Sequence, residues 1–212
     1  MSEKELISMP ETDQLLLENN ILSSSLLVGL FNHITDDKTL AVLDMGLASS
    51  SSVNFFGRTK CRLQFAGLIE PEIDSYNNQE LSHAERVSLF KEILNLQPNT
   101  KIDIILFWDI FCYLSAPAIG ALLETLMPNL HARTKAHSIG LLNARQKMLY
   151  SEYGIQAIDQ LWQQPVNSIQ PKIYPHSRHD FGRLLSYFSI DKSCLLSGNR
   201  VENILMINSQ AN

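Results

Sequence analysis

Short apolar runs, separated by segments of helical periodicity, constrain the fold of this chain more than any other feature. The runs lie at residues 39–43, 61–65, 102–108 and 138–142. Each has the length of a strand that is buried on both faces, and residues 102–108 are also rich in β-branched side chains. Strands of this kind alternate with helices in proteins built on a mostly parallel sheet. The alternation therefore predicts an α/β fold with helices on both faces of the sheet.

The segments between these runs carry helix start signals. Ser82 is followed three residues later by Glu85, which is the spacing of a capping box, and Pro117 lies just after Ser115 in a predicted first turn. The apolar residues of each segment share one helical face: Val87, Phe90 and Leu94 in the first, and Ile119, Leu122, Leu123 and Leu126 in the second.

The carboxyl-terminal part predicts a different arrangement. Ser177 begins a third helix, whose apolar face is formed by Phe181, Leu184, Leu185 and Phe188. Residues 193–196 and 203–207 then form two predicted strands, joined through a Ser-Gly-Asn-Arg turn. That turn is a hairpin signal, so we expect the sheet to end on an antiparallel hairpin.

Two segments have weaker patterns. Residues 12–34 have apolar residues at mostly helical spacing, so we expect residues 1–38 to form an N-terminal helical cap before an α/β domain at 39–212. Residues 144–175 are interpreted as an irregular insertion that is rich in glutamine and carries four aromatic residues, Tyr150, Tyr153, Trp162 and Tyr174. These aromatics either cover a binding site or hold the segment against the domain or a partner subunit.

Composition excludes some functions. The net charge of −5 argues against a broad nucleic-acid-binding face, so no nucleic-acid partner is expected. The three widely spaced cysteines and the polar, acidic N-terminus predict a cytoplasmic protein that does not associate with membranes. His176 and His179 have no third ligand at a recognisable spacing, so no metal site is expected. His131 and His137 flank a basic stretch that is interpreted as a solvated connection.

The first apolar run ends in Val-Leu-Asp44-Met-Gly46 and opens a turn of small residues, Leu-Ala-Ser-Ser-Ser-Ser. This resembles the first motif of class I S-adenosylmethionine (AdoMet)-dependent methyltransferases, a strand that ends in acid-x-Gly-x-Gly-x-Gly. Small residues in such a turn let the backbone approach the cofactor, and the next helix presents free N–H groups. Of the three motif glycines only Gly46 is present, because Ala48 and Ser50 occupy the later positions.

The resemblance covers about residues 39–207. Residues 102–115 are similar to the fourth-strand motif of the family, and the terminal helix and hairpin are similar to its last elements, of which the seventh strand is antiparallel. It implies a Rossmann-like methyltransferase fold with a mostly parallel seven-stranded sheet that ends in an antiparallel hairpin. Ligands of such sheets bind at the carboxyl ends of the strands.

The resemblance also implies site residues. The candidate AdoMet contacts are Asp44, Gly46, Ala48, Gln64 near the ribose, and Trp108 as a wall of the pocket. Gln64 replaces the acid that the family usually has there, and Glu70 is the alternative. Asp109 and Tyr113 are the catalytic candidates, with Asp109 near the transferred methyl group. The competing interpretations are that the acids end a strand or cap a helix and that the aromatics belong to the core.

Two functions stay open. The first is an AdoMet-dependent methyltransferase whose acceptor is an unidentified small molecule or protein side chain, with catalysis mostly by positioning. The second is a methyltransferase-like scaffold that has lost its cofactor and binds or regulates a protein partner; Ala48, Ser50 and the missing ribose acid favour it. A homo-oligomer is compatible with either. A dinucleotide oxidoreductase would need a Gly-x-Gly-x-x-Gly turn, which the chain lacks.

Overall fold

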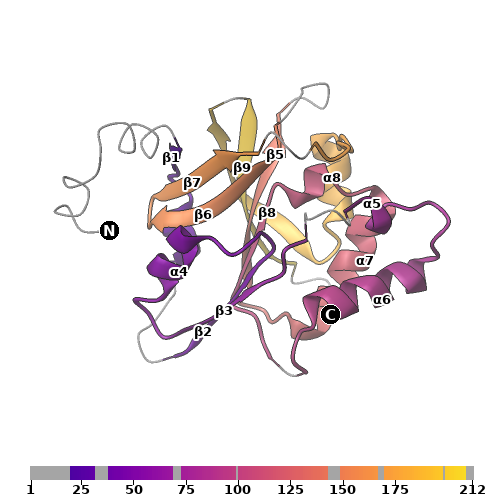
Figure 1. Cartoon of the computed structure of the whole chain (residues 1–212), viewed down its shortest axis with the longest axis horizontal. Coiled ribbons are helices and arrows are strands. Elements are labelled where there is room, and N and C mark those ends of the chain that lie inside the picture. The colour runs from indigo at the N-terminus through magenta and orange to yellow at the C-terminus, as the bar shows by residue number, and fades with distance from the viewer. Residues whose placement is uncertain are drawn as a thin grey trace.

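The computed structural model of the chain describes residues 20–31, 38–68, 73–98, 100–142, 149–166, 170–197 and 199–208. Within these residues the chain forms a six-stranded central sheet and a separate three-stranded sheet. Figure 1 shows α6, α7 and α8 on one side of the central sheet, and α4 with the smaller sheet on the other.

The central sheet confirms the predicted α/β architecture. Its strand order is β3-β2-β4-β5-β9-β8, and its first four strands are mutually parallel. β9 is antiparallel to both of its neighbours and forms the predicted terminal hairpin with β8. The strands are β2 (Leu40–Asp44), β3 (Cys61–Phe65), β4 (Ile104–Trp108), β5 (Lys135–Leu141), β8 (Phe188–Leu196) and β9 (Arg200–Ile207).

The sheet holds six strands among the described residues rather than the seven expected. The described residues between β3 and β4 form two helices, α5 (Ile73–Tyr76) and α6 (His83–Leu94), and no strand. β3 is therefore an edge of the central sheet.

The helices begin where the capping signals predict. Ser82 and Glu85 form both hydrogen bonds of a capping box at the start of α6, and α7 (Ala116–Leu126) has Pro117 in its first turn. Ser177 caps α8 (Arg178–Leu184) by accepting a hydrogen bond from the backbone of Asp180. The remaining helices are α3 (Leu27–Phe31), α4 (Ser50–Phe56) and the short 3-10 turns η1 (Ile110–Cys112) and η2 (Met127–Asn129).

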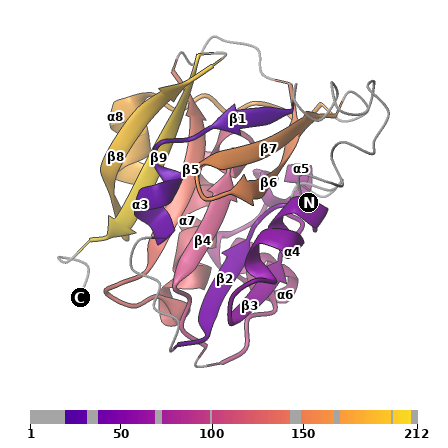
Figure 2. The same cartoon turned by 90° about the vertical axis from the view of Figure 1, so that its left-hand side faces the viewer.

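The smaller sheet corrects two expectations. Ile21–Ser23 form a strand, β1, rather than part of a helix, and the segment expected to be irregular contains the hairpin of β6 (Ser151–Ala157) and β7 (Gln160–Pro165). β1 pairs with the outer edge of β7, where its backbone satisfies groups that would otherwise be unpaired. Figure 2 shows this sheet in front of the central one. Residues 1–19 and 143–148 lie outside the described part of the chain.

Apolar side chains fill both sides of the central sheet. Phe90, Phe107 and Leu122 belong to the core on the side of α6 and α7, whereas Leu30, Phe56 and Ile155 belong to the core beneath α3, α4 and the hairpin. None of the described helices combines the length and the apolar character that a membrane crossing requires.

Candidate functional site

Asp44 ends β2 at the carboxyl edge of the central sheet, beside β4. Its side chain is fully buried, and its Oδ1 accepts hydrogen bonds from the backbone N–H of Gly46 at 2.9 Å and from the indole Nε1 of Trp108 at 2.5 Å. Its Oδ2 has no hydrogen-bond partner among the described residues. Burial raises the pKa of Asp44 to about 7, although these hydrogen bonds oppose the rise.

Asp109, the second candidate acid, follows β4 and is also fully buried. Its Oδ2 accepts hydrogen bonds from the hydroxyls of Tyr113 at 3.1 Å and Tyr153 at 3.2 Å. Burial raises the pKa of Asp109 to about 7, while the two hydroxyls and the positive charge of Arg200 lower it. The structure therefore brings the two catalytic candidates, Asp109 and Tyr113, into direct contact.

Trp108 fills the space beside the glycine turn. Its φ of +51° lies in the left-handed region, which is uncommon for a bulky residue. A Cβ added to Gly46 would lie 3.2 Å from both Cδ1 and Nε1 of the indole. The indole also stacks on the ring of Tyr153 from the hairpin, with the ring centroids 5.4 Å apart.

The β6–β7 hairpin covers the N-terminus of α4. A Cβ added to Gly154 would overlap the hydroxyls of Ser49 and Ser51, so the strand backbone lies directly against these serines. The backbone N–H of Ile155 donates a hydrogen bond of 3.1 Å to Oγ of Ser52. Figure 1 shows β6 beside α4. The helix end that the resemblance places against a cofactor here faces a strand of the same chain.

The other cofactor candidates lie apart from this cluster. Gln64 donates a hydrogen bond of 2.6 Å to the backbone oxygen of Leu94 and lines a small hollow between the strands β2 and β3 and the segment that follows α6. Ala48 is exposed on the turn after β2, and Glu70 lies outside the described residues. Asp44, Gly46, Trp108, Asp109 and Tyr113 come together, but Gln64 does not join them.

Several buried polar residues on the hairpin and on the strands β5 and β9 are not predicted by the sequence patterns. Arg200 donates hydrogen bonds to Gln163 at 2.8 Å and to the Tyr153 hydroxyl at 3.4 Å. His137, which borders the stretch interpreted as a solvated connection, is fully buried on β5, with its Nε2 2.8 Å from Oε1 of Glu202. The only signal for these residues is the presence of polar side chains in otherwise apolar strands, and that pattern does not identify their partners.

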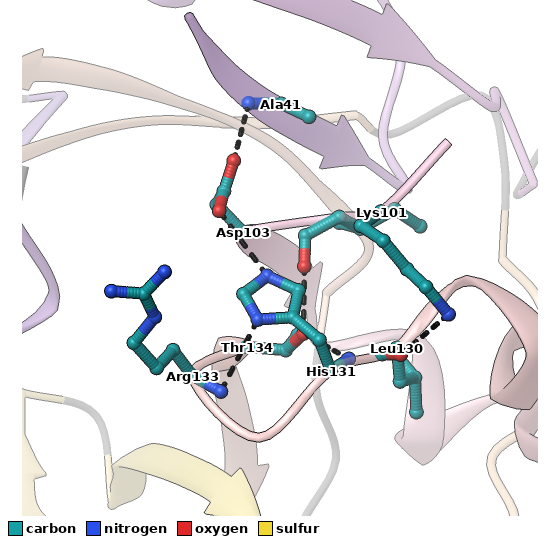
Figure 3. Close-up of polar contacts among 8 residues, drawn as sticks. Ala41, Lys101, Asp103, Leu130, His131, Arg133 and Thr134 are labelled. Atoms are coloured by element: carbon teal, nitrogen blue, oxygen red, sulfur yellow. Dashed lines mark hydrogen bonds and ion pairs between the residues drawn. The ribbon is translucent and has the colours of Figure 1, made fainter. Parts of the chain in front are cut away.

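A separate polar cluster lies at the opposite, amino-terminal edge of the sheet (Figure 3). Asp103 accepts a hydrogen bond from the backbone N–H of Ala41 at 2.8 Å, and its other oxygen lies 3.2 Å from Nε2 of His131. Thr134 donates to the backbone oxygen of Ile102 at 2.7 Å. These contacts join the beginnings of β2, β4 and β5, so we assign the cluster a structural role.

AdoMet is the cofactor that the fold implies, and its fit can be judged from this geometry. Binding at the motif requires open space beside the glycine turn and accessible N–H groups at the next helix N-terminus. Trp108 occupies the space beside the glycine turn, and β6 covers the N-terminus of α4. The residues in this conformation therefore do not fit AdoMet.

No family model and no curated protein sequence matches this chain. Among solved structures, the PH0226 protein from Pyrococcus horikoshii OT3 matches with a TM-score of 0.51 and 10% identity over 98% of this chain and 100% of that one. The 1,6-didemethyltoxoflavin-N1-methyltransferase of Burkholderia thailandensis matches with a TM-score of 0.48 and 13% identity over 97% and 87% of the two chains. A SAM-dependent methyltransferase from Aquifex aeolicus matches with a TM-score of 0.44 and 14% identity, over 98% of this chain and 100% of that one.

At these identities the likeness concerns the fold alone. The match to the PH0226 protein supports the α/β fold, and the order and direction of the central strands agree with the methyltransferase-like fold expected from the sequence.

Proposed function

We propose that this chain is a methyltransferase-fold protein in which its own side chains have replaced the AdoMet site, and that it works as a non-catalytic binding or regulatory protein. The observation that supports this most directly is the indole of Trp108, which is packed on Gly46 and hydrogen-bonded to Asp44. The cover formed by β6 over Ser49 and Ser51 supports it independently.

The energetic cost of moving Trp108 away from the carboxyl edge of the central sheet supports the same conclusion. Burying a tryptophan removes about 150–250 Å² from water, worth about 4–6 kcal/mol at roughly 25 cal/mol per Å². A cofactor that had to displace Trp108 would lose affinity by about 10³- to 10⁴-fold, since about 1.4 kcal/mol corresponds to a factor of ten. A ligand of ordinary micromolar affinity would then bind only at millimolar concentrations or above.

A second candidate, an AdoMet-dependent methyltransferase of unidentified acceptor, is favoured by one observation. The buried Oδ2 of Asp44 and Oδ1 of Asp109 have no hydrogen-bond partners among the described residues. Buried polar atoms are normally paired, so these two oxygens are compatible with a second conformation in which a ligand contacts them. That function requires Trp108 and the hairpin to move first.

Thermal unfolding with AdoMet or S-adenosylhomocysteine separates the two candidates. A ligand at about 100 times its dissociation constant adds roughly 2.7 kcal/mol, or about 5–10 °C for a chain of this size. We expect no shift for the wild-type protein with either compound. A shift of that size in the wild type would refute the proposal and favour the methyltransferase. A shift in Trp108→Ala alone would support the indole as the group that excludes the cofactor.

A further inference from the structure

A pocket lies between the central sheet and α8. It is bordered by Phe111 and Cys112 after β4, by the end of β5 around Gly140, and by Phe181 of α8. It shares no residue with the cluster around Asp44, Trp108 and Asp109. Its volume is about 110 Å³. A single buried water needs about 10–15 Å³ of such space, so the pocket has room for a molecule of about ten non-hydrogen atoms.

The absence of a side chain at Gly140 helps to form this pocket. Residues alternate between the two faces of a strand, so Gly140 shares a face with Ala136, which belongs to the core on the α6 and α7 side. A Cβ added to Gly140 would meet no atom within 4 Å. A larger residue would therefore fit the backbone and occupy the pocket.

The outer wall of the pocket is fixed by two hydrogen bonds. The backbone N–H of Tyr174 donates to the backbone oxygen of Cys112 at 2.8 Å, and Nε2 of His176 lies 2.8 Å from the backbone oxygen of Leu114. Both residues line the pocket, which is therefore preformed. A preformed pocket lowers the entropic cost of binding a ligand.

The residues that line the pocket indicate the chemistry of its ligand. Most of the lining residues that the structure describes are aromatic or aliphatic, none of them is acidic, and Arg178 supplies their permanent charge. A guanidinium group pairs preferentially with a carboxylate. We propose that this pocket binds a small apolar molecule with one carboxylate, whose body lies against Phe111 and Phe181 and whose charge faces Arg178. This inference goes beyond the proposed function and holds whether or not the Asp44 edge binds AdoMet.

Calorimetric titration of the full chain with octanoate, octan-1-ol and octylamine, at a pH where histidine is neutral, tests the proposal. Octanoate has ten non-hydrogen atoms, the size that about 110 Å³ allows. We expect octanoate to bind about fivefold more tightly than the alcohol, which is the factor for an exposed ion pair of about 1 kcal/mol, and the amine to bind weakest. Absence of octanoate binding up to about 10 mM, or equal affinity for all three compounds, would overturn the proposal.

Two variants locate the site. Gly140→Val should abolish octanoate binding and keep the fold, because the position is open and valine favours strands. Arg178→Gln should weaken octanoate about fivefold and leave octan-1-ol unchanged, because it removes the charged guanidinium group and keeps the apolar lining. Arg183→Gln, on the same helix but outside the pocket lining, is the matched control and should change neither. Unchanged octanoate binding in folded Gly140→Val or Arg178→Gln would overturn the assignment.

Discussion

The rings of Trp108 and Tyr153 are stacked, with their planes within 11° of parallel, although one residue ends β4 and the other belongs to the β6–β7 hairpin. The same tyrosine donates a hydrogen bond to Asp109. This pair thereby connects the hairpin both to the glycine turn after β2 and to the buried acid after β4. Trp108 and Tyr153 form the junction between the two sheets.

Replacing Trp108 tests both its packing and its backbone. Trp108→Ala should lower the free energy of unfolding by about 3–5 kcal/mol, the usual cost of removing a buried tryptophan. Because its φ is +51°, Trp108→Gly should be at least as stable as the alanine variant, the reverse of the usual order. Urea unfolding of both variants measures this. A glycine variant about 1 kcal/mol less stable than alanine would contradict the left-handed backbone.

The buried acids predict a pH dependence of stability. The pKa values of Asp44 and Asp109 are raised to about 7 in the folded protein, from an ordinary value of 3.8. Between these values the folded state holds more protons than the unfolded state, so the free energy of unfolding falls as pH rises from about 4 to about 7. Above about pH 7 both carboxyl groups are ionised in the folded and in the unfolded state, and the free energy of unfolding falls no further from this cause.

Asp109→Asn should reduce this dependence, because the amide does not ionise and its oxygen can still accept from Tyr113 and Tyr153. Melting temperatures measured between about pH 5 and pH 8 should fall less in the variant than in the wild type. Asp191→Asn, at an exposed position of β8, is the control and should follow the wild-type curve. Parallel curves for Asp109→Asn and the wild type would show that Asp109 is ionised at low pH.

The close contact of Gly154 with Ser49 and Ser51 predicts that a side chain at Gly154 lowers the stability of the protein. Gly120, which has no such contact, is the matched control. Gly154→Ala should destabilise the protein by about 1–3 kcal/mol, because the new methyl group overlaps Ser49 and Ser51. Gly120→Ala, inside α7 where a Cβ would meet nothing within 4 Å, should stabilise it by about 0.5–1 kcal/mol. Denaturant midpoints measure both. A neutral Gly154→Ala would mean that the hairpin does not lie against the turn.

Ser24, which directly follows β1, connects the N-terminal strand to β9 of the central sheet. Its hydroxyl donates a hydrogen bond of 2.6 Å to buried Glu202 and accepts one of 3.1 Å from the backbone N–H of Leu27. Ser24→Ala should cost about 1–3 kcal/mol, since it leaves a buried carboxylate with one partner fewer. Ser25→Ala, at the exposed neighbouring position, should cost less than about 0.5 kcal/mol. Equal losses from chemical denaturation would refute the role of Ser24.

The central sheet could be predicted because its strands and helices have strong local signals. Residues 102–108 contain a strand that is buried over its whole length, and the Ser82–Glu85 capping box forms at the start of α6. The hairpin of β6 and β7 has no such signal. Its connection is Ile158-Asp159, which lacks the glycine or asparagine of the favoured tight turns, and β7 contains several glutamines.

The site could be predicted only in part. Asp44, Gly46, Trp108, Asp109 and Tyr113 do meet, because parallel strands bring their carboxyl ends to one edge. The sequence left open whether the aromatic residues of 144–175 cover this edge, and it gave no indication that Gly154 lies against Ser49 and Ser51. That contact depends on where an insertion folds back, and no local pattern encodes a pairing so distant in the chain.

The pairing of β1 with β7 joins Ile21 to Trp162. During synthesis, the ribosome releases Ile21 and then β2 to β5 before the partner strand β7 exists, so β1 stays unpaired while these four parallel strands come together. Contacts of such high sequence separation form slowly, because a long loop has to close before any of its hydrogen bonds is gained. The pairing of β1 with β7 is thus expected to form late, after the local β6–β7 hairpin, and the outer edge of β7 stays unpaired until β1 joins it.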